Sequence, residues 1–130
     1  MRTVTHGRSR ENRRASDIQA IIDDDAVTVS IYRMVGDNIT APAVETLMAT
    51  FEARLDFMKA RYRDLERHDI VGQATNMPYL MLTRKDTDAQ GRAITYQRGD
   101  TALINGVRYL VIYRDDSYSY KTDGLLEVIT

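Results

Sequence analysis

Apolar positions change their spacing along the chain, and the change predicts a short helix followed by several strands. Ile18, Ile21 and Ile22 follow the i, i+3, i+4 spacing of one helix face. Ser16 is a typical N-cap residue, and the acidic run at 23–25 meets the unfavourable end of the helix dipole. The pattern therefore predicts a two-turn helix that begins after Ser16 and ends at the acidic run.

From residue 27 the apolar residues alternate with polar ones, which is the period of a strand with one buried face. The first such strand covers 27–31, and turn residues follow it at 36–38 and 41–42. A short apolar run at 79–83 predicts a second, buried strand.

The last third of the chain carries the clearest signal, a β-hairpin. Asn105-Gly106 separates apolar runs at 101–104 and 107–113, and both residues tolerate the positive φ of a two-residue turn. A closing strand is predicted at 125–129. Alternation along the second run places four residues on one face: Val107, Tyr109, Val111 and Tyr113. The predicted fold is mainly β, a small antiparallel β-barrel or sandwich with a short N-terminal helix and a long loop.

Residues 43–68 fit two templates. At helical spacing their apolar residues form a stripe, and the composition, rich in Ala, Glu, Leu and Arg, favours a helix. At a period of two, residues 51–57 alternate as a half-buried strand. An α+β fold with a helix at 43–68 is therefore the alternative fold class.

The composition is that of one soluble globular domain with few residues suited to catalysis or metal binding. The chain has 130 residues, 43% of them hydrophobic, with a mean hydropathy of −0.42. It lacks a long apolar run and a signal-peptide pattern, so no membrane partner is expected. There is no Cys and there are only two His, which leaves no thiolate nucleophile and no Cys-based zinc site. We expect no enzymatic activity, no metal and no cofactor.

Several local motifs resemble functional sites, and each has a plainer interpretation. Consecutive side chains such as those at 23–25 rarely converge on one cation, so a solvated turn is expected there. Residues 86–91 resemble the opening of a calcium loop, but Gln97 stands where a bidentate Glu is needed. His68 lies beside an acid but near no nucleophile in sequence. Two tripeptides are treated as chance matches: Asn38-Ile39-Thr40 and Arg98-Gly99-Asp100.

Positive charge is concentrated in the first 16 residues, although the whole chain has a formal charge of −1. This segment has five Arg, one acid and almost no apolar residue, which predicts an extended arm (1–16) attached to a single β-rich domain (17–130). The arm is either a solvated terminus or a segment that binds an acidic surface or phosphates. The candidate partner-binding residues are Arg2, Arg8, Arg10, Arg13 and Arg14, with Arg61 and Arg63 from a stretch of mixed charge.

The order of elements also carries a family resemblance, over about residues 17–130. A short helix, Asp17-Ile18-Gln19-Ala20-Ile21-Ile22, precedes the strand Val27-Thr28-Val29-Ser30-Ile31. The chain ends with Arg98-Gly99-Asp100, the hairpin Ile104-Asn105-Gly106-Val107-Arg108-Tyr109-Leu110-Val111 and a closing strand. In this order the chain resembles the head-closure (stopper or neck) proteins of long-tailed bacteriophages.

The resemblance implies a structural virion protein that forms a homo-oligomeric ring at the head–tail connector. Such a ring lies between the portal–adaptor complex and the tail, retains the packaged DNA in its channel and presents the surface for tail attachment. The resemblance also favours a strand at 46–57, followed by a loop through Met77, and gives the arm a docking role on the adjoining ring. The alternative function is a small nucleic-acid-binding β-domain that uses the Arg-rich arm and aromatic residues such as Tyr109 and Tyr113.

Overall fold

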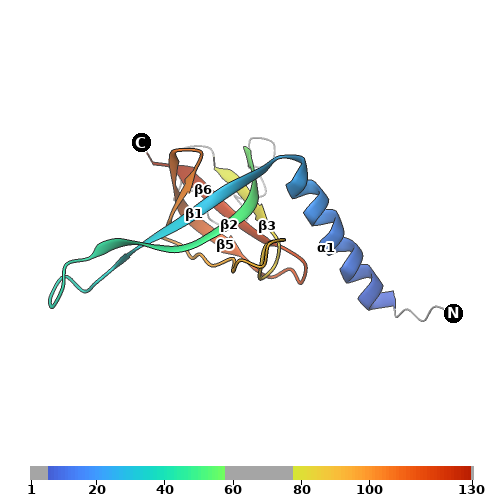
Figure 1. The fold of residues 1–130 in the computed structure, drawn as a ribbon, viewed down its shortest axis with the longest axis horizontal. Coiled ribbons are helices and arrows are strands. Elements are labelled where there is room, and N and C mark those ends of the chain that lie inside the picture. Colours follow the sequence, from blue (N-terminus) through green and yellow to red (C-terminus); the bar gives the residue numbers. More distant parts are fainter. Residues whose placement is uncertain (1–5, 58–77, 130) are drawn as a thin grey trace.

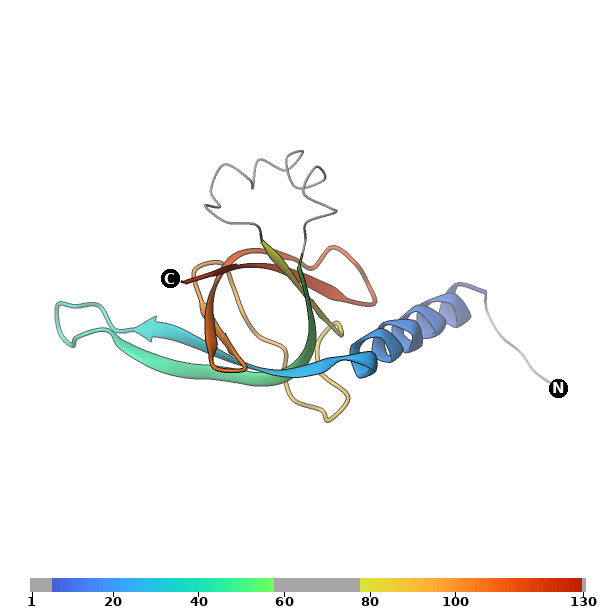
Figure 2. The same cartoon turned by 90° about the horizontal axis from the view of Figure 1, so that it is seen from above.

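The protein is a closed barrel of six antiparallel strands with one helix, as the computed structural model shows (Figures 1 and 2). The structure describes residues 6–57 and 78–129, with side chains from residue 13 onward. The elements are α1 (His6–Asp24), β1 (Ala26–Val35), β2 (Val44–Phe57), β3 (Tyr79–Thr83), β4 (Thr101–Ile104), β5 (Val107–Asp115) and β6 (Thr122–Val128). Around the barrel the order is β1-β2-β3-β6-β5-β4, and β4 pairs with β1 to close it. The predicted mainly β fold is confirmed as a barrel.

Alternate residues of the strands fill the barrel, as expected for half-buried strands. Two large side chains in the core, Ile94 and Tyr96, come from the segment between β3 and β4. Tyr96 is 1% exposed, and its ring lies 6.0 Å from that of Phe51. A Cβ at Gly124 on β6 would come within 2.9 Å of the Tyr96 hydroxyl, so β6 needs a glycine there. The core cluster consists of Val29, Ile31, Phe51, Ala53, Met81, Ile94, Tyr96, Ala102, Ile104, Tyr109, Val111 and Leu126.

The ambiguous stretch at 43–68 forms a strand as far as the structure describes it. Residues 44–57 are β2, which pairs with β1 along its length and with β3 over 54–57. The alternative of a helix at 43–68 is wrong for these residues, because strand pairing lets Phe51 and Ala53 both enter the core. Met77, and the long loop predicted to end there, lie outside the described residues.

The predicted hairpin around Asn105-Gly106 is confirmed. Both residues have positive φ, 51° and 80°, and Ile104 pairs with Val107 across the turn. The predicted shared face of the second strand is wrong at Tyr113, since the register between β5 and β6 shifts between Val111 and Tyr113. At this bulge Ile112 is buried, with 6% exposure, and Tyr113 is 38% exposed.

Helix α1 is longer than predicted. It begins at His6, so Ser16 is not its N-cap, and residues 6–16 of the predicted extended arm are helical. The physical reason lies at the other end of the helix, where Ile18 and Ile22 pack against Leu82. Once that contact nucleates the helix, Arg and Glu residues extend it at little cost.

The predicted end of the helix at the acidic run is confirmed, because α1 stops at Asp24. Arg54 of β2 caps this end of the helix. Its guanidinium donates hydrogen bonds to the Ile21 carbonyl at 3.1 Å and to the Asp24 carboxylate at 3.3 Å. The cap supplies positive charge where the helix dipole and the acidic residues both require it.

Candidate interaction surfaces

The β1–β2 hairpin extends well beyond the barrel (Figures 1 and 2). The pairing of β1 with β4 ends at Tyr32, but β1 and β2 stay paired as far as Val35 and Val44. A register shift lies at the point of departure, where Tyr32 pairs with Leu47 and the preceding Ile31 with Ala49. Such a bulge bends and twists the strand pair away from the barrel. We call residues 33–47 the projecting hairpin.

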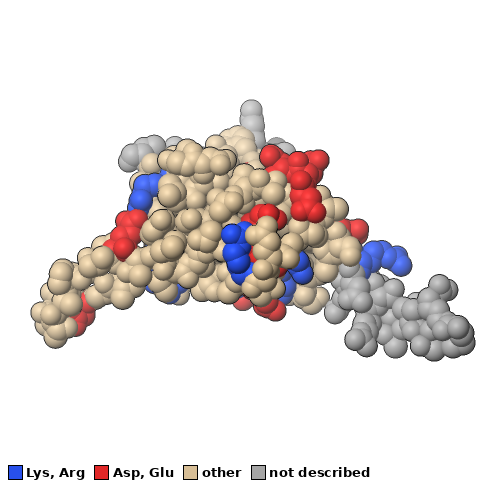
Figure 3. Space-filling model, viewed as in Figure 1, with Lys and Arg blue, Asp and Glu red and all other residues tan. Residues whose placement is uncertain are grey.

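The projecting hairpin is unusually apolar for an exposed element. Its large apolar side chains are between 48% and 89% exposed, and Figure 3 shows few charged side chains along it. Clustered exposed apolar side chains mark interaction sites, whereas single ones are common on any protein surface. These side chains are Met34, Val35, Ile39, Val44 and Leu47.

Two ion pairs hold the base of the hairpin against the barrel. On β1, the guanidinium of Arg33 binds both carboxylate oxygens of Asp100, at 2.8 and 2.9 Å, and Asp100 is 1% exposed. On β2, Glu45 accepts from Arg108 of β5 at 2.8 Å. The buried pair is geometrically specific, while the exposed pair contributes little to stability. Together they give the hairpin a defined direction from the barrel.

The tip of the hairpin is a well-bonded turn. The Asp37 carboxylate accepts hydrogen bonds from the amides of residues 39–41 and, at 2.7 Å, from the Thr40 hydroxyl. These bonds hold the pKa of Asp37 far below its usual value, so the tip keeps a negative charge. Asn38 has a φ of 61°, and its side chain accepts from the Ala43 amide. Ile39 follows Asn38 in this turn, and its side chain is 89% exposed.

On the opposite side of the barrel, a cleft lies beside α1 (Figure 2 shows the helix and the hairpin on opposite sides). Its volume is about 200 Å³. The Arg14 guanidinium lies 5.3 Å from the centre of the Tyr120 ring at this cleft, and the Lys85 ammonium donates to the Asp116 carbonyl. We call it the α1 cleft; its lining residues are Ala15, Arg84, Lys85, Asp86, Thr87, Ser119 and Tyr120.

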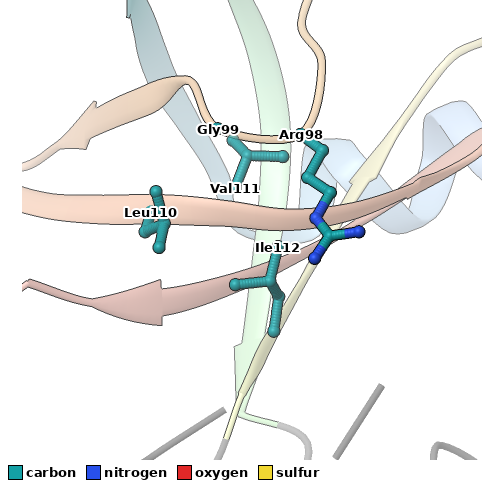
Figure 4. Close-up of a pocket in the computed structure, with 5 residues that line it drawn as sticks. All are labelled: Arg98, Gly99, Leu110, Val111 and Ile112. Carbon is teal, nitrogen blue, oxygen red and sulfur yellow. The ribbon is translucent and has the colours of Figure 1, made fainter. Parts of the chain in front are cut away.

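A second depression, of about 270 Å³, lies over β5 (Figure 4). The Gly99 amide donates to the Val111 carbonyl at 2.8 Å, which holds the loop before β4 against the strand. The Arg98 side chain crosses β5 beside Ile112, and Leu110 is partly exposed. The described lining of this depression consists of one cation, a glycine and three aliphatic side chains.

The calcium-like segment at 86–91 is a turn organised by Asp88. This buried carboxylate accepts from the Gln90 and Arg92 amides at 2.9 Å and from the Arg92 guanidinium at 2.8 Å. Burial by itself would raise the pKa of Asp88, but these hydrogen bonds lower it on balance. Among the described residues, no three His, Asp or Glu side chains are arranged to hold a metal ion.

The structure brings few of the predicted partner-binding residues together. Arg13 and Arg14 are exposed on α1, and only Arg14 lies at the α1 cleft. Arg8 and Arg10 belong to α1, and the structure describes their backbone but not their side chains. The remaining three, Arg2, Arg61 and Arg63, lie outside the described residues.

Sequence reasoning missed the projecting hairpin. One signal for it was present: Met34 and Val35 precede the turn and Val44 follows it.

No helix in the described parts of the chain has the length and apolar character to cross a membrane. The chain matches no protein-family model, no curated protein and no solved structure in comparisons with each. What the chain does must therefore be argued from its own surfaces.

Proposed function

We propose that this chain is a ring-forming head-closure subunit at the head–tail connector of a tailed bacteriophage, where it retains packaged DNA and provides the surface for tail attachment. The observation that supports the proposal best is the placement of two projections, the hairpin and α1, on opposite sides of a closed barrel (Figure 2). The resemblance in the order of elements points in the same direction.

A ring of identical subunits needs two different contact surfaces on each copy, because every subunit meets its neighbours head to tail. Projections on opposite sides meet this requirement. Closure of the barrel leaves its own strands paired, so the projecting hairpin and α1 are the elements best placed to reach a neighbour. A two-stranded hairpin is only marginally stable in water, and a neighbouring subunit would order it further.

The alternative, a small nucleic-acid-binding domain, has less support. Tyr109, one of the proposed stacking residues, is 7% exposed, and its ring packs 5.4 Å from that of Tyr79. Tyr113 is 38% exposed, but three arginines, Arg33, Arg92 and Arg108, are paired with acids. Base stacking needs an exposed aromatic face beside unpaired positive charge.

The proposal is tested in the phage that encodes the chain. Deletion of its gene should give heads that fill with DNA, then lose it and accept no tails. Protein supplied in trans should restore both DNA retention and tail attachment. A deletion strain that still yields filled, tailed particles would overturn the proposal.

A binding assay separates the alternative function. The purified protein should associate with portal–adaptor rings and show little affinity for free DNA or RNA. Tight nucleic-acid binding that falls steeply with salt, without association to those rings, would favour the binding module.

A further inference from the structure

We infer that the tip of the projecting hairpin of one copy docks into the α1 cleft of a second copy. This inference deepens the proposed function and rests on it for the identity of the occupant, a second copy of the chain. It names the two surfaces that meet and the chemistry that joins them.

The tip carries an exposed apolar side chain that the cleft can accommodate. Ile39 is the most exposed large hydrophobic residue of the described chain, at 89%. The α1 cleft, at about 200 Å³, has room for it, since an apolar cavity of about 150 Å³ is enough to hold a benzene molecule. Ala15 and Tyr120 give the cleft an apolar component for this side chain. Docking would remove Ile39 from water.

The tip and the cleft carry opposite charges. Asp37 is the only ionisable residue in the turn at 36–43, and its hydrogen bonds keep it ionised. The cleft lining includes Arg84 and Lys85 against one acid, Asp86, and Arg14 adds a further positive charge beside it. A negative tip therefore meets a cleft with net positive charge. Such complementarity selects the partner surface and its orientation.

The positions of the two surfaces exclude docking within one copy. The hairpin and α1 lie on opposite sides of one barrel (Figures 1 and 2), and the cleft lies beside α1, so a copy does not reach its own cleft. The ion pairs of Arg33 and Glu45 direct the hairpin before it meets a partner, which lowers the ordering cost of association. Repetition of this heterologous contact generates a ring if its rotation closes.

The absence of cysteine from the chain allows a direct test by disulfide trapping. Ile39→Cys and Ala15→Cys are made in separate proteins, mixed and oxidised gently. The mixed dimer should form about tenfold faster than with the control Thr95→Cys, an exposed position outside both surfaces, because docking raises the local thiol concentration. Equal rates for the two mixtures, or a predominant dimer of Ile39→Cys with itself, would overturn the inference.

Complementary variants test the polarity of the contact. Arg84→Glu with Lys85→Glu reverses the charge of the cleft, and Thr95→Asp is the matched control for an added acid. Ile39→Asp places a charge at the apolar contact and is tested for particle assembly. In the disulfide background, Ile39→Cys should trap with Ala15→Cys only when the Ala15→Cys copy keeps its native Arg84 and Lys85. Trapping that survives the two Glu substitutions would contradict the charge argument. Melting temperatures close to that of the parent protein show that each variant is folded.

The outcomes distinguish this inference from the proposed function. If the tip traps in the cleft but the phage does not need the protein for tailed particles, the contact stands and the proposed function fails. If the phage needs the protein but Ile39→Asp supports normal particles and no trapping occurs, the function stands and the contact fails.

Discussion

At the residue scale, aspartate side chains stabilise the loops of this protein. Asp37, Asp88 and Asp100 each accept hydrogen bonds from the backbone amides of their own turn. Two of them belong to motifs that look functional in the sequence, the calcium-like segment at 86–91 and the tripeptide that ends at Asp100. In the structure their carboxylates are already engaged with amides and with an arginine. This supports the plainer interpretation of both motifs.

Asp88→Asn should destabilise the protein by about 2 kcal/mol at pH 7, because the amide loses charge-assisted bonds to Arg92. The pKa of Asp88 is lowered in the folded state, so its stabilising effect is complete above the unfolded-state value of about 4 and is lost as the pH falls further. The difference between parent and variant in urea unfolding should therefore shrink from pH 5 to more acid conditions. A difference that stays constant with pH would contradict this role for the Asp88 charge.

Gly106→Val should lower the free energy of unfolding by about 1–2 kcal/mol, since Val is strained at a φ of 80°. A Cβ at this position meets no atom within 4 Å, so the cost is conformational and not a clash. Gly106→Asn is the matched control, because Asn tolerates positive φ, and it should cost much less. Thermal unfolding of the three proteins checks the order; equal melting temperatures would mean that the turn does not constrain the hairpin.

At the scale of elements, the helix and the hairpin are each anchored at one end only. Helix α1 packs through Ile18 and Ile22, and Arg54 caps its end, while its first turns extend away from the barrel. The projecting hairpin is held by its base and carries apolar side chains outward. The unanchored ends of these two elements contribute little to the fold and are free to serve assembly.

Deletion of residues 1–14 should leave the melting temperature within about 2 °C of the parent value, because the anchoring residues Ile18 and Ile22 remain. The helical signal in circular dichroism should nevertheless fall, since α1 begins at His6. Ile22→Ala is the control with the opposite pattern: it should cost about 2–4 kcal/mol through the cavity it leaves. A large loss of stability in the truncated protein would show that the first turns pack on the domain.

At the scale of the whole molecule, closure of the barrel divides the chain into a protected part and a projecting part. Residues 29–32 of β1 pair with β2 on one side and with β4 on the other. Beyond them, 33–35 pair only with β2 among the described residues. The same strand thus passes from pairing on both sides to pairing on one side only.

Hydrogen exchange should detect this division. In the isolated protein, amides at 29–32 should exchange only through global unfolding, and amides at 33–35 and 44–47 at least about tenfold faster, through local opening. Assembly into rings should slow exchange in the second group and leave the first unchanged. Uniform protection along β1 in the isolated protein would contradict the division.

The sequence by itself determined what depends on neighbouring residues. Alternation predicted the first strand, and apolar runs predicted the strands at 79–83 and in the last third of the chain. The apolar stripe with its acidic end predicted where α1 stops, and Asn105-Gly106 predicted a hairpin turn that the structure confirms. These features are local, because backbone periodicity and turn conformation are set within a few residues. The Arg-rich segment was the local feature least well interpreted, since its helix depends on packing farther along the chain.

Only the tertiary structure decided the features that depend on distant partners. Residues 44–57 have both helical and strand periodicity, and pairing with β1 and β3 selects the strand. Pairing with β6 places the bulge between Val111 and Tyr113. The projecting hairpin exists because β4 ends its pairing with β1 at Tyr32, and the α1 cleft exists because segments far apart in the sequence meet beside the helix. Strand pairing and surface shape join residues across the whole chain, so no local pattern contains them.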